Sequence, residues 1–211
     1  HHGPTWLTRM WANLWINNVY FTGIALLGLF WIAFQYAAQA GWATVFKRVP
    51  ESFGWYIPFG GLMLLIVFLG GSHDLFHWTH EGITVEGSDN YDALIAGKSG
   101  YLNTPFFLIR MIAYITLWTL MYFLIRKQSL LEDEIGGIET HNASIKWSVV
   151  FILIFGVTSS TSAWDWILSI DTHWFSTMFG WYVLSSWLIS AISAILLLVV
   201  LLKEAGYLSK A

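Results

Sequence analysis

Long stretches without charged residues divide this sequence into apolar segments. Asp, Glu, Lys and Arg are missing from the runs 10–46, 52–73, 111–125, 147–164 and 172–202. A helix needs about 20 apolar residues to cross a bilayer, and several of these runs reach that length. The pattern predicts an all-α integral membrane protein with about five transmembrane helices in a single domain (1–211) that includes an ordered outer loop (73–104). We place the helices near residues 11–38, 54–72, 105–126, 147–168 and 177–203.

The composition supports this class and excludes others. Of the 211 residues, 56% are apolar and 11% are charged, whereas soluble domains contain about 25% charged residues. The net charge of −3 argues against a nucleic-acid partner. The chain has no cysteine, so it cannot hold an iron–sulfur cluster through thiolates, attach a c-type haem or form a disulfide. Any such redox centre would belong to a partner subunit.

The distribution of Lys and Arg predicts how the helices are oriented. These residues are more frequent after the first, third and fifth helices than on the opposite side, and the 169–176 loop has none. The positive-inside rule therefore places the start of the chain and the 73–104 and 169–176 loops outside. The acidic 73–104 loop would be either an ordered lid or docking surface, or a solvated linker. The 129–145 segment has the composition of a solvated cytoplasmic connection.

With this orientation, polar side chains from all five helices fall in one layer near the outer face, and the inner halves of the helices are mostly apolar. Arg110 lies five residues after Pro105, about 7–8 Å along the third helix. Asp165 lies at a similar depth on the fourth helix, so an ion pair is expected. That pair would either simply satisfy two groups that are costly to bury, or hold Asp165 charged until a quinol or proton arrives. Asn17 of the first helix belongs to the same layer.

Two further polar groups have a structural and a functional interpretation. His73, His77 and His80, with Asp74 among them, are more typical of an interfacial histidine cluster than of a metal site, and we assign no metal. The hydroxyl run 158–162 would serve helix packing, with a proton wire as the alternative.

Three segments resemble a known family: YAAQAGW (36–42), GKSGYLNTPFFLIR (97–110) and SAWDWILSIDTHWFSTMFGWYVLSS (162–186). They are similar to the F subunits (quinone-binding subunit 2) of bacterial alternative complex III, a quinol:cytochrome c oxidoreductase. Those subunits are related to the NrfD/polysulfide-reductase membrane subunits. Family members have about ten helices, in two four-helix bundles plus flanking helices. The resemblance therefore implies that this chain represents one bundle and a neighbouring helix.

The resemblance also implies a location, cofactors and partners. The chain would be a multi-pass protein of the bacterial inner membrane without a covalently bound cofactor, and menaquinone is its candidate ligand. Haems and iron–sulfur clusters would lie on partner subunits. The expected partners are an iron–sulfur subunit, multihaem and monohaem cytochrome c subunits, a paralogous NrfD-like membrane subunit and a terminal oxidase, together with lipids. Asp165, Asp171 and His173 match the family motif and would form an outward proton path, and Arg110 matches within FFLIR.

Three functions remain open at this stage. The leading hypothesis is an accessory membrane subunit of a menaquinol:cytochrome c oxidoreductase in a respiratory chain, with an outer proton path or quinone pocket. Candidate residues for that role are Asp165, Asp171, His173, Arg110, His73, Asp74 and Asn17. The second hypothesis is a structural anchor for periplasmic cytochrome subunits. An ion or solute transporter is the weakest, because only Pro58–Gly61 suggests the broken helix that transporters often contain.

Overall fold

The computed structural model describes residues 6–208, which form helices and connecting loops without a β-strand. The long helices are α1 (Trp6–Ala37), α3 (Tyr56–Leu75), α5 (Thr104–Glu134), α6 (Ile138–Trp166) and α7 (Phe179–Glu204). The short ones are η1 (Gly41–Phe46), α2 (Arg48–Phe53), η2 (His77–Thr79), α4 (Ala93–Lys98) and η3 (Leu168–Ile170). Five segments of the described chain are long and apolar enough to cross a membrane, which confirms the predicted fold class.

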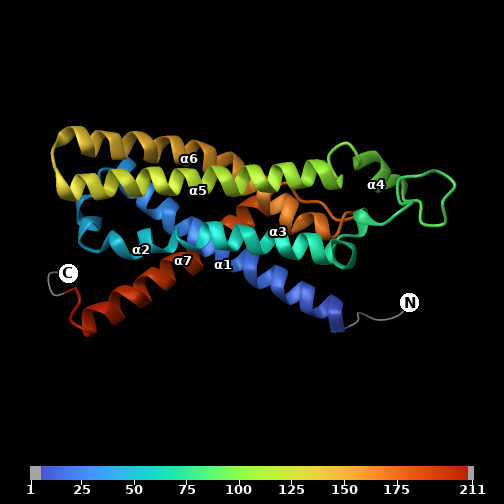
Figure 1. Cartoon of the computed structure of the whole chain (residues 1–211), viewed down its shortest axis with the longest axis horizontal. Coiled ribbons are helices and arrows are strands. Elements are labelled where there is room, and N and C mark those ends of the chain that lie inside the picture. Colours follow the sequence, from blue (N-terminus) through green and yellow to red (C-terminus); the bar gives the residue numbers. More distant parts are fainter. Residues whose placement is uncertain (1–5, 209–211) are drawn as a thin grey trace.

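Helix α1 occupies the centre of the bundle and contacts α2, α3, α6 and α7 (Figure 1). Helix α5 packs along α6 and against α3. Of the most apolar 18 residues of each helix, 67% are buried in α1 but only 22% in α7. The C-terminal part of α7 diverges from the other helices (Figure 1). The architecture is therefore a bundle of α1, α3, α5 and α6 with α7 as a neighbouring helix.

Helix α3 runs without interruption through the Pro58–Gly61 stretch. Pro58 lies in the first turn, where the missing N–H costs no helix hydrogen bond. Gly60 and Gly61 allow neighbouring helices to approach closely. A Cβ at Gly60 would lie 2.2 Å from Thr22 Oγ1, and one at Gly61 would lie 2.4 Å from Ile115 Cγ2. The glycines therefore allow close packing of helices, and α3 has no break at Pro58–Gly61 of the kind that transporters often contain.

Helices α5 and α6 extend well beyond the predicted membrane segments. The 129–145 segment is mostly helical, because α5 continues to Glu134 and α6 begins at Ile138, and most of its residues are exposed or half-buried. Glu, Leu, Lys and Gln are good helix formers, so the helices continue beyond the apolar residues that can lie in the membrane. The turn itself contains Gly136 and Gly137 with φ of +68° and +92°, values that favour glycine.

The bundle has two ends that differ in structure, and we name them for their short helices. The α4 end holds the start of α1, residues 76–103, the start of α5 and the 167–178 connection (Figure 1). Within it, Phe76, Trp78 and Ile95 are buried in the core and attach residues 76–103 to the bundle. The η1 end holds η1, α2 and the α5–α6 turn.

Candidate functional site

A buried ion pair connects α5 to α6 at the α4 end. Arg110 Nε and Nη2 donate to the two carboxylate oxygens of Asp165 at 2.8 and 2.9 Å, and the Tyr114 hydroxyl donates to Oδ2 at 3.1 Å. Asp165 is 1% exposed and Arg110 8%. The ion pair expected from matching depths is thus present. It is bidentate, which is the strongest geometry for this pair of groups.

The connection before α5 completes the surroundings of the guanidinium. Arg110 Nη1 donates to the Tyr101 carbonyl at 3.0 Å, and its central carbon lies 3.8 Å from the centroid of the Tyr101 ring and 4.4 Å from that of Phe106. Burial, reinforced by the Asp165 charge, raises the pKa of the Tyr101 phenol above its ordinary value. Tyr101 therefore remains a neutral hydroxyl group at physiological pH.

A pocket of about 410 Å³ adjoins this network at the α4 end. Its lining includes four aromatic residues, Tyr101, Trp164, Trp174 and Phe175, together with Lys98. Thr172 also lines it and is 4% exposed, and its Oγ1 has no hydrogen-bond partner among the described residues. Ligand pockets typically measure about 300–1,000 Å³ and combine apolar walls with a few polar groups. This aromatic pocket therefore has a size and walls that suit a planar apolar ligand.

Asp171 and His173 lie on the exposed connection between η3 and α7 and make local contacts. His173 Nε2 lies 2.8 Å from Asp92 Oδ2, and the His173 backbone N–H donates to Asp171 Oδ1 at 3.2 Å. Lys98 Nζ donates to the Thr172 carbonyl at 2.6 Å. These contacts attach the connection to α4. No hydrogen bond or ion pair of either side chain reaches the Arg110–Asp165 pair, so a proton path between them stays a prediction.

The other candidates lie apart from the buried pair. The His73 and His80 rings stack with centroids 4.2 Å apart, and Thr8 Oγ1 donates to Asp74 at 3.3 Å. Asn17 is exposed and donates to the carbonyl of Asn13 in its own helix at 2.8 Å. Within residues 6–208, no group of three or more His, Cys, Asp or Glu side chains is placed to hold a metal ion.

The hydroxyl run of α6 bonds mainly to its own helix. Thr158 donates to the Ile154 carbonyl at 2.8 Å, and Ser162 donates to the Ser159 carbonyl at 3.0 Å. Thr158 also accepts a hydrogen bond from Trp118 Nε1 at 2.9 Å, which joins α5 to α6. This pattern agrees with the packing interpretation. Asn18 belongs to the same polar layer of α1 as Asn17 but is buried, and it donates to the Gly60 carbonyl at 2.7 Å.

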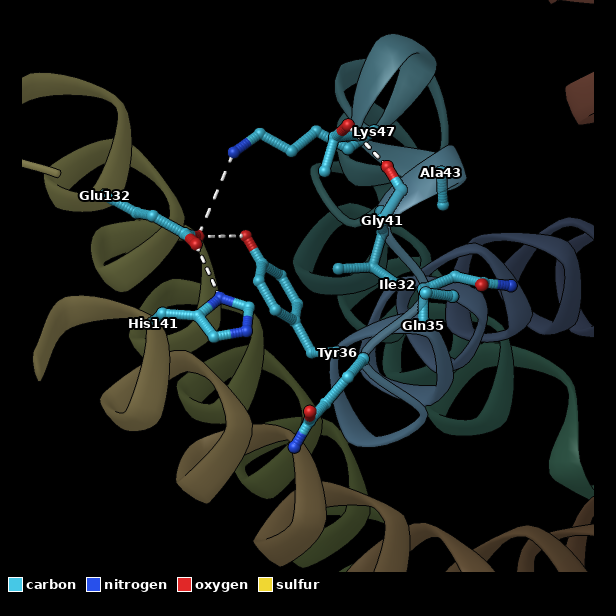
Figure 2. Close-up of a pocket in the computed structure, with 11 residues that line it drawn as sticks. Ile32, Gln35, Tyr36, Gly41, Ala43, Lys47, Glu132 and His141 are labelled. Atoms are coloured by element: carbon cyan, nitrogen blue, oxygen red, sulfur yellow. Dashed lines mark hydrogen bonds and ion pairs between the residues drawn. The ribbon is translucent and has the colours of Figure 1, made fainter. Parts of the chain in front are cut away.

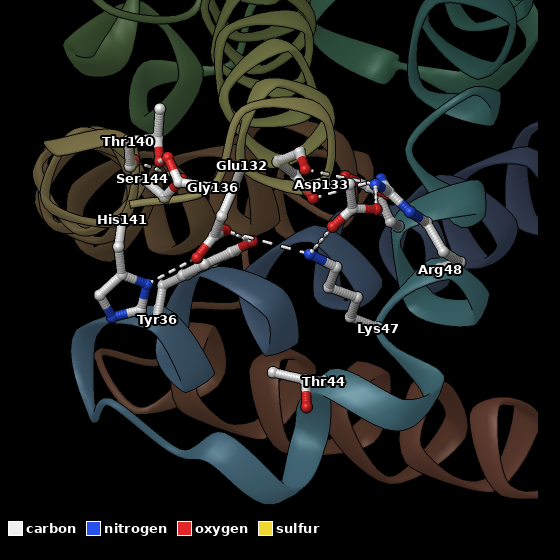
Figure 3. A network of polar contacts seen from close by, with 12 residues as sticks. Tyr36, Thr44, Lys47, Arg48, Glu132, Asp133, Gly136, Thr140, His141 and Ser144 are labelled. Carbon is white, nitrogen blue, oxygen red and sulfur yellow. Dashed lines mark hydrogen bonds and ion pairs between the residues drawn. The ribbon is translucent and has the colours of Figure 1, made fainter. Parts of the chain in front are cut away.

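A second polar network occupies the η1 end, where the sequence suggested mostly apolar helix halves (Figure 3). Lys47 Nζ lies 2.6 Å from Asp133 Oδ1, and Arg48 pairs with both Asp133 and Glu51. Glu51 is 1% exposed and also forms an ion pair with Arg126, whose Nη1 lies 3.4 Å from Glu51 Oε2. The available signal was the opposite charge of residues 47–48 and 132–134. Separated by more than 80 positions, these groups were interpreted as solvated.

Glu132 is the centre of the part of this network that faces α1. Its carboxylate accepts the Tyr36 hydroxyl at 2.7 Å and contacts His141 Nδ1 at 2.7 Å, with Lys47 Nζ 4.0 Å away (Figure 2). These four residues come from α1, the η1–α2 junction, α5 and α6. Glu132 therefore joins segments that are far apart in the sequence.

A scan against protein-family models gave no match to this chain, and a search of curated proteins gave none either. Within the described residues, five long apolar helices indicate the class of the protein, a multi-pass all-α chain suited to a membrane.

Proposed function

We propose that this chain is an accessory membrane subunit of a menaquinol:cytochrome c oxidoreductase of the alternative complex III type. The observation that carries the proposal is the aromatic pocket beside the buried Arg110–Asp165 pair, with the unpartnered Thr172 hydroxyl in its wall. The family motifs at 97–110 and 162–186 contain the residues of both features. By the positive-inside rule the pocket faces the periplasm of a bacterial inner membrane.

The residues of the pocket suit a quinol. When bound, menaquinol would supply two electrons and two protons. Trp174 and Phe175 would contact its ring, and Thr172 Oγ1, once turned toward the pocket, would hydrogen-bond to one ring oxygen. Asp165 already accepts three hydrogen bonds and is held in one geometry by Arg110 and Tyr114. Because the chain has no cysteine for a haem c or iron–sulfur cluster, the electrons would pass to partner cytochrome subunits.

The pair has a specific role in this scheme. Arg110 also binds the carbonyl of Tyr101, so the ion pair positions one wall of the pocket. Asp171 and His173 would carry protons away from the pocket to the outer surface, where both are exposed.

A purely structural anchor is the second candidate. This candidate is favoured because Asp165 and the hydroxyls of the 158–162 run form their hydrogen bonds with other groups of the chain. In that case the α4 end, including residues 76–103, would dock periplasmic cytochrome subunits. A transporter has no comparable support, because α3 is continuous.

The substitution Thr172→Val tests the proposal, because it keeps the shape of the side chain and removes its hydroxyl. In the assembled complex we expect KM for menaquinol to rise about three- to ten-fold, which corresponds to one hydrogen bond. Thr177→Val, on an exposed position of the same connection, is the matched control. An unchanged KM in Thr172→Val, with normal assembly, would favour the anchor.

A further inference from the structure

A second cavity of about 250 Å³ lies at the η1 end (Figure 2). It is enclosed by the last turn of α1, by η1 and by the facing ends of α5 and α6. Ile32, Ala40 and Ala43 provide apolar walls, and Tyr36 contributes its ring. We call it the η1 cavity. It is far along the bundle from the aromatic pocket, which is at the α4 end (Figure 1).

The charged groups of the η1 cavity balance each other. Lys47 and Glu132 both line it, with Nζ and Oε2 separated by 4.0 Å. Glu132 is further satisfied by Tyr36 and His141. An anion would meet the carboxylate and a cation would meet the ammonium group, so a neutral occupant costs least.

Two polar groups of the η1 cavity are left for an occupant. Gln35 is 7% exposed and lines the cavity, and its side-chain amide has no hydrogen-bond partner among the described residues. The second is Nε2 of His141. A carboxylate can only accept, so His141 Nδ1 donates to Glu132, and Nε2 is the ring nitrogen left for an occupant. A hydroxyl group can both donate and accept, so it can hydrogen-bond to this nitrogen.

We propose that the η1 cavity binds a neutral, apolar ring carrying a hydroxyl group, that is, a ligand of the phenol or hydroquinone class. The hydroxyl hydrogen-bonds to His141 Nε2, and the Gln35 amide is available to a second oxygen of the ligand. The ring packs between Ile32, Ala43 and the ring of Tyr36. This site does not depend on the proposed function, because it shares no residue with the aromatic pocket.

The test uses the full chain in lipid nanodiscs and 2-naphthol as the probe. Equilibrium dialysis is done with the Thr172→Val chain, whose aromatic pocket lacks its hydroxyl, and is corrected with empty nanodiscs. It should give one saturable site per chain, whereas naphthalene, which has no hydrogen-bonding oxygen, should give none. His141→Phe and Gln35→Met keep side-chain volume and should weaken 2-naphthol binding at least ten-fold. Ala43→Phe should abolish it by filling the cavity.

Two further variants locate the binding site. Ser52→Ala, at the same end but outside the cavity lining, should bind as the wild type does. Far-UV circular dichroism of each variant checks that the helices are intact. The proposal is overturned if folded His141→Phe and Gln35→Met bind normally, if naphthalene binds as well as 2-naphthol, or if the Thr172→Val chain shows no saturable site.

Discussion

Removing the charge of Arg110 should destabilise the bundle strongly, because it leaves the buried Asp165 carboxyl group without its charged partner. Asp165 is 1% exposed, and two of its three hydrogen bonds come from the guanidinium. Removing one partner from such a pair costs about 3–5 kcal/mol. We expect Arg110→Met and Asp165→Leu each to lower the free energy of unfolding by about that amount. The double variant should recover much of the loss, because apolar residues of similar size replace a buried pair at little cost.

A double-mutant cycle measures this coupling directly. The free energy of unfolding of wild type, both single variants and the double variant would be obtained by titration with SDS in mixed micelles. The exposed Arg9 provides a matched control, and Arg9→Met should change stability by no more than about 0.5 kcal/mol. Strict additivity of the two single variants, or losses below about 1 kcal/mol for each, would refute a coupled buried pair.

Two other predictions concern the α4 end and the centre of the bundle. The pKa of Asp92 lies below its usual value, mainly because its carboxylate accepts a hydrogen bond from the backbone N–H of Ile95. The stabilisation of α4 by this carboxylate is therefore present above the unfolded pKa of about 3.9 and is lost as pH falls through the lower folded value. The hydrogen-exchange protection factors of the α4 amides should fall on acidification in the wild type and much less in Asp92→Asn, and equal acid sensitivity would contradict this. Gly60→Ala should destabilise by about 1–3 kcal/mol, because the new Cβ would overlap Thr22 Oγ1. Gly156→Ala, which meets nothing within 4 Å, is the control for thermal unfolding, and equal melting temperatures would count against tight α1–α3 packing.

The class of fold could be predicted because it depends on patterns within each segment. Charge-free runs mark the membrane helices, and matching Arg110 with Asp165 needed only helix rise and chain direction. Rotation about a helix axis was harder to assign. Asn17 and Asn18 are adjacent in sequence, yet Asn17 is exposed and Asn18 is buried against Gly60. The hydrophobic pattern of a membrane helix is apolar on all faces and does not say which one is inside.

The remaining features depend on tertiary contacts between distant segments. Thr172 was not singled out, because a threonine in a polar loop carries no sign that it will be 4% exposed and unpartnered beside aromatic rings. The Glu132 network was missed because Lys47 and His141 come from other elements, and their charges suggested solvated connections. Polar residues just beyond a membrane segment are often solvated, so composition alone could not place these in contact.

Photoaffinity labelling of the intact assembly tests the central claim most directly. An azido derivative of menaquinone would be activated on the purified complex, and labelled peptides would be identified by mass spectrometry. We expect label within residues 164–175 and at Tyr101, which line the aromatic pocket, and we expect excess menaquinol to prevent it. Label confined to other subunits, or label in this chain that excess menaquinol does not reduce, would contradict a quinol site beside the Arg110–Asp165 pair.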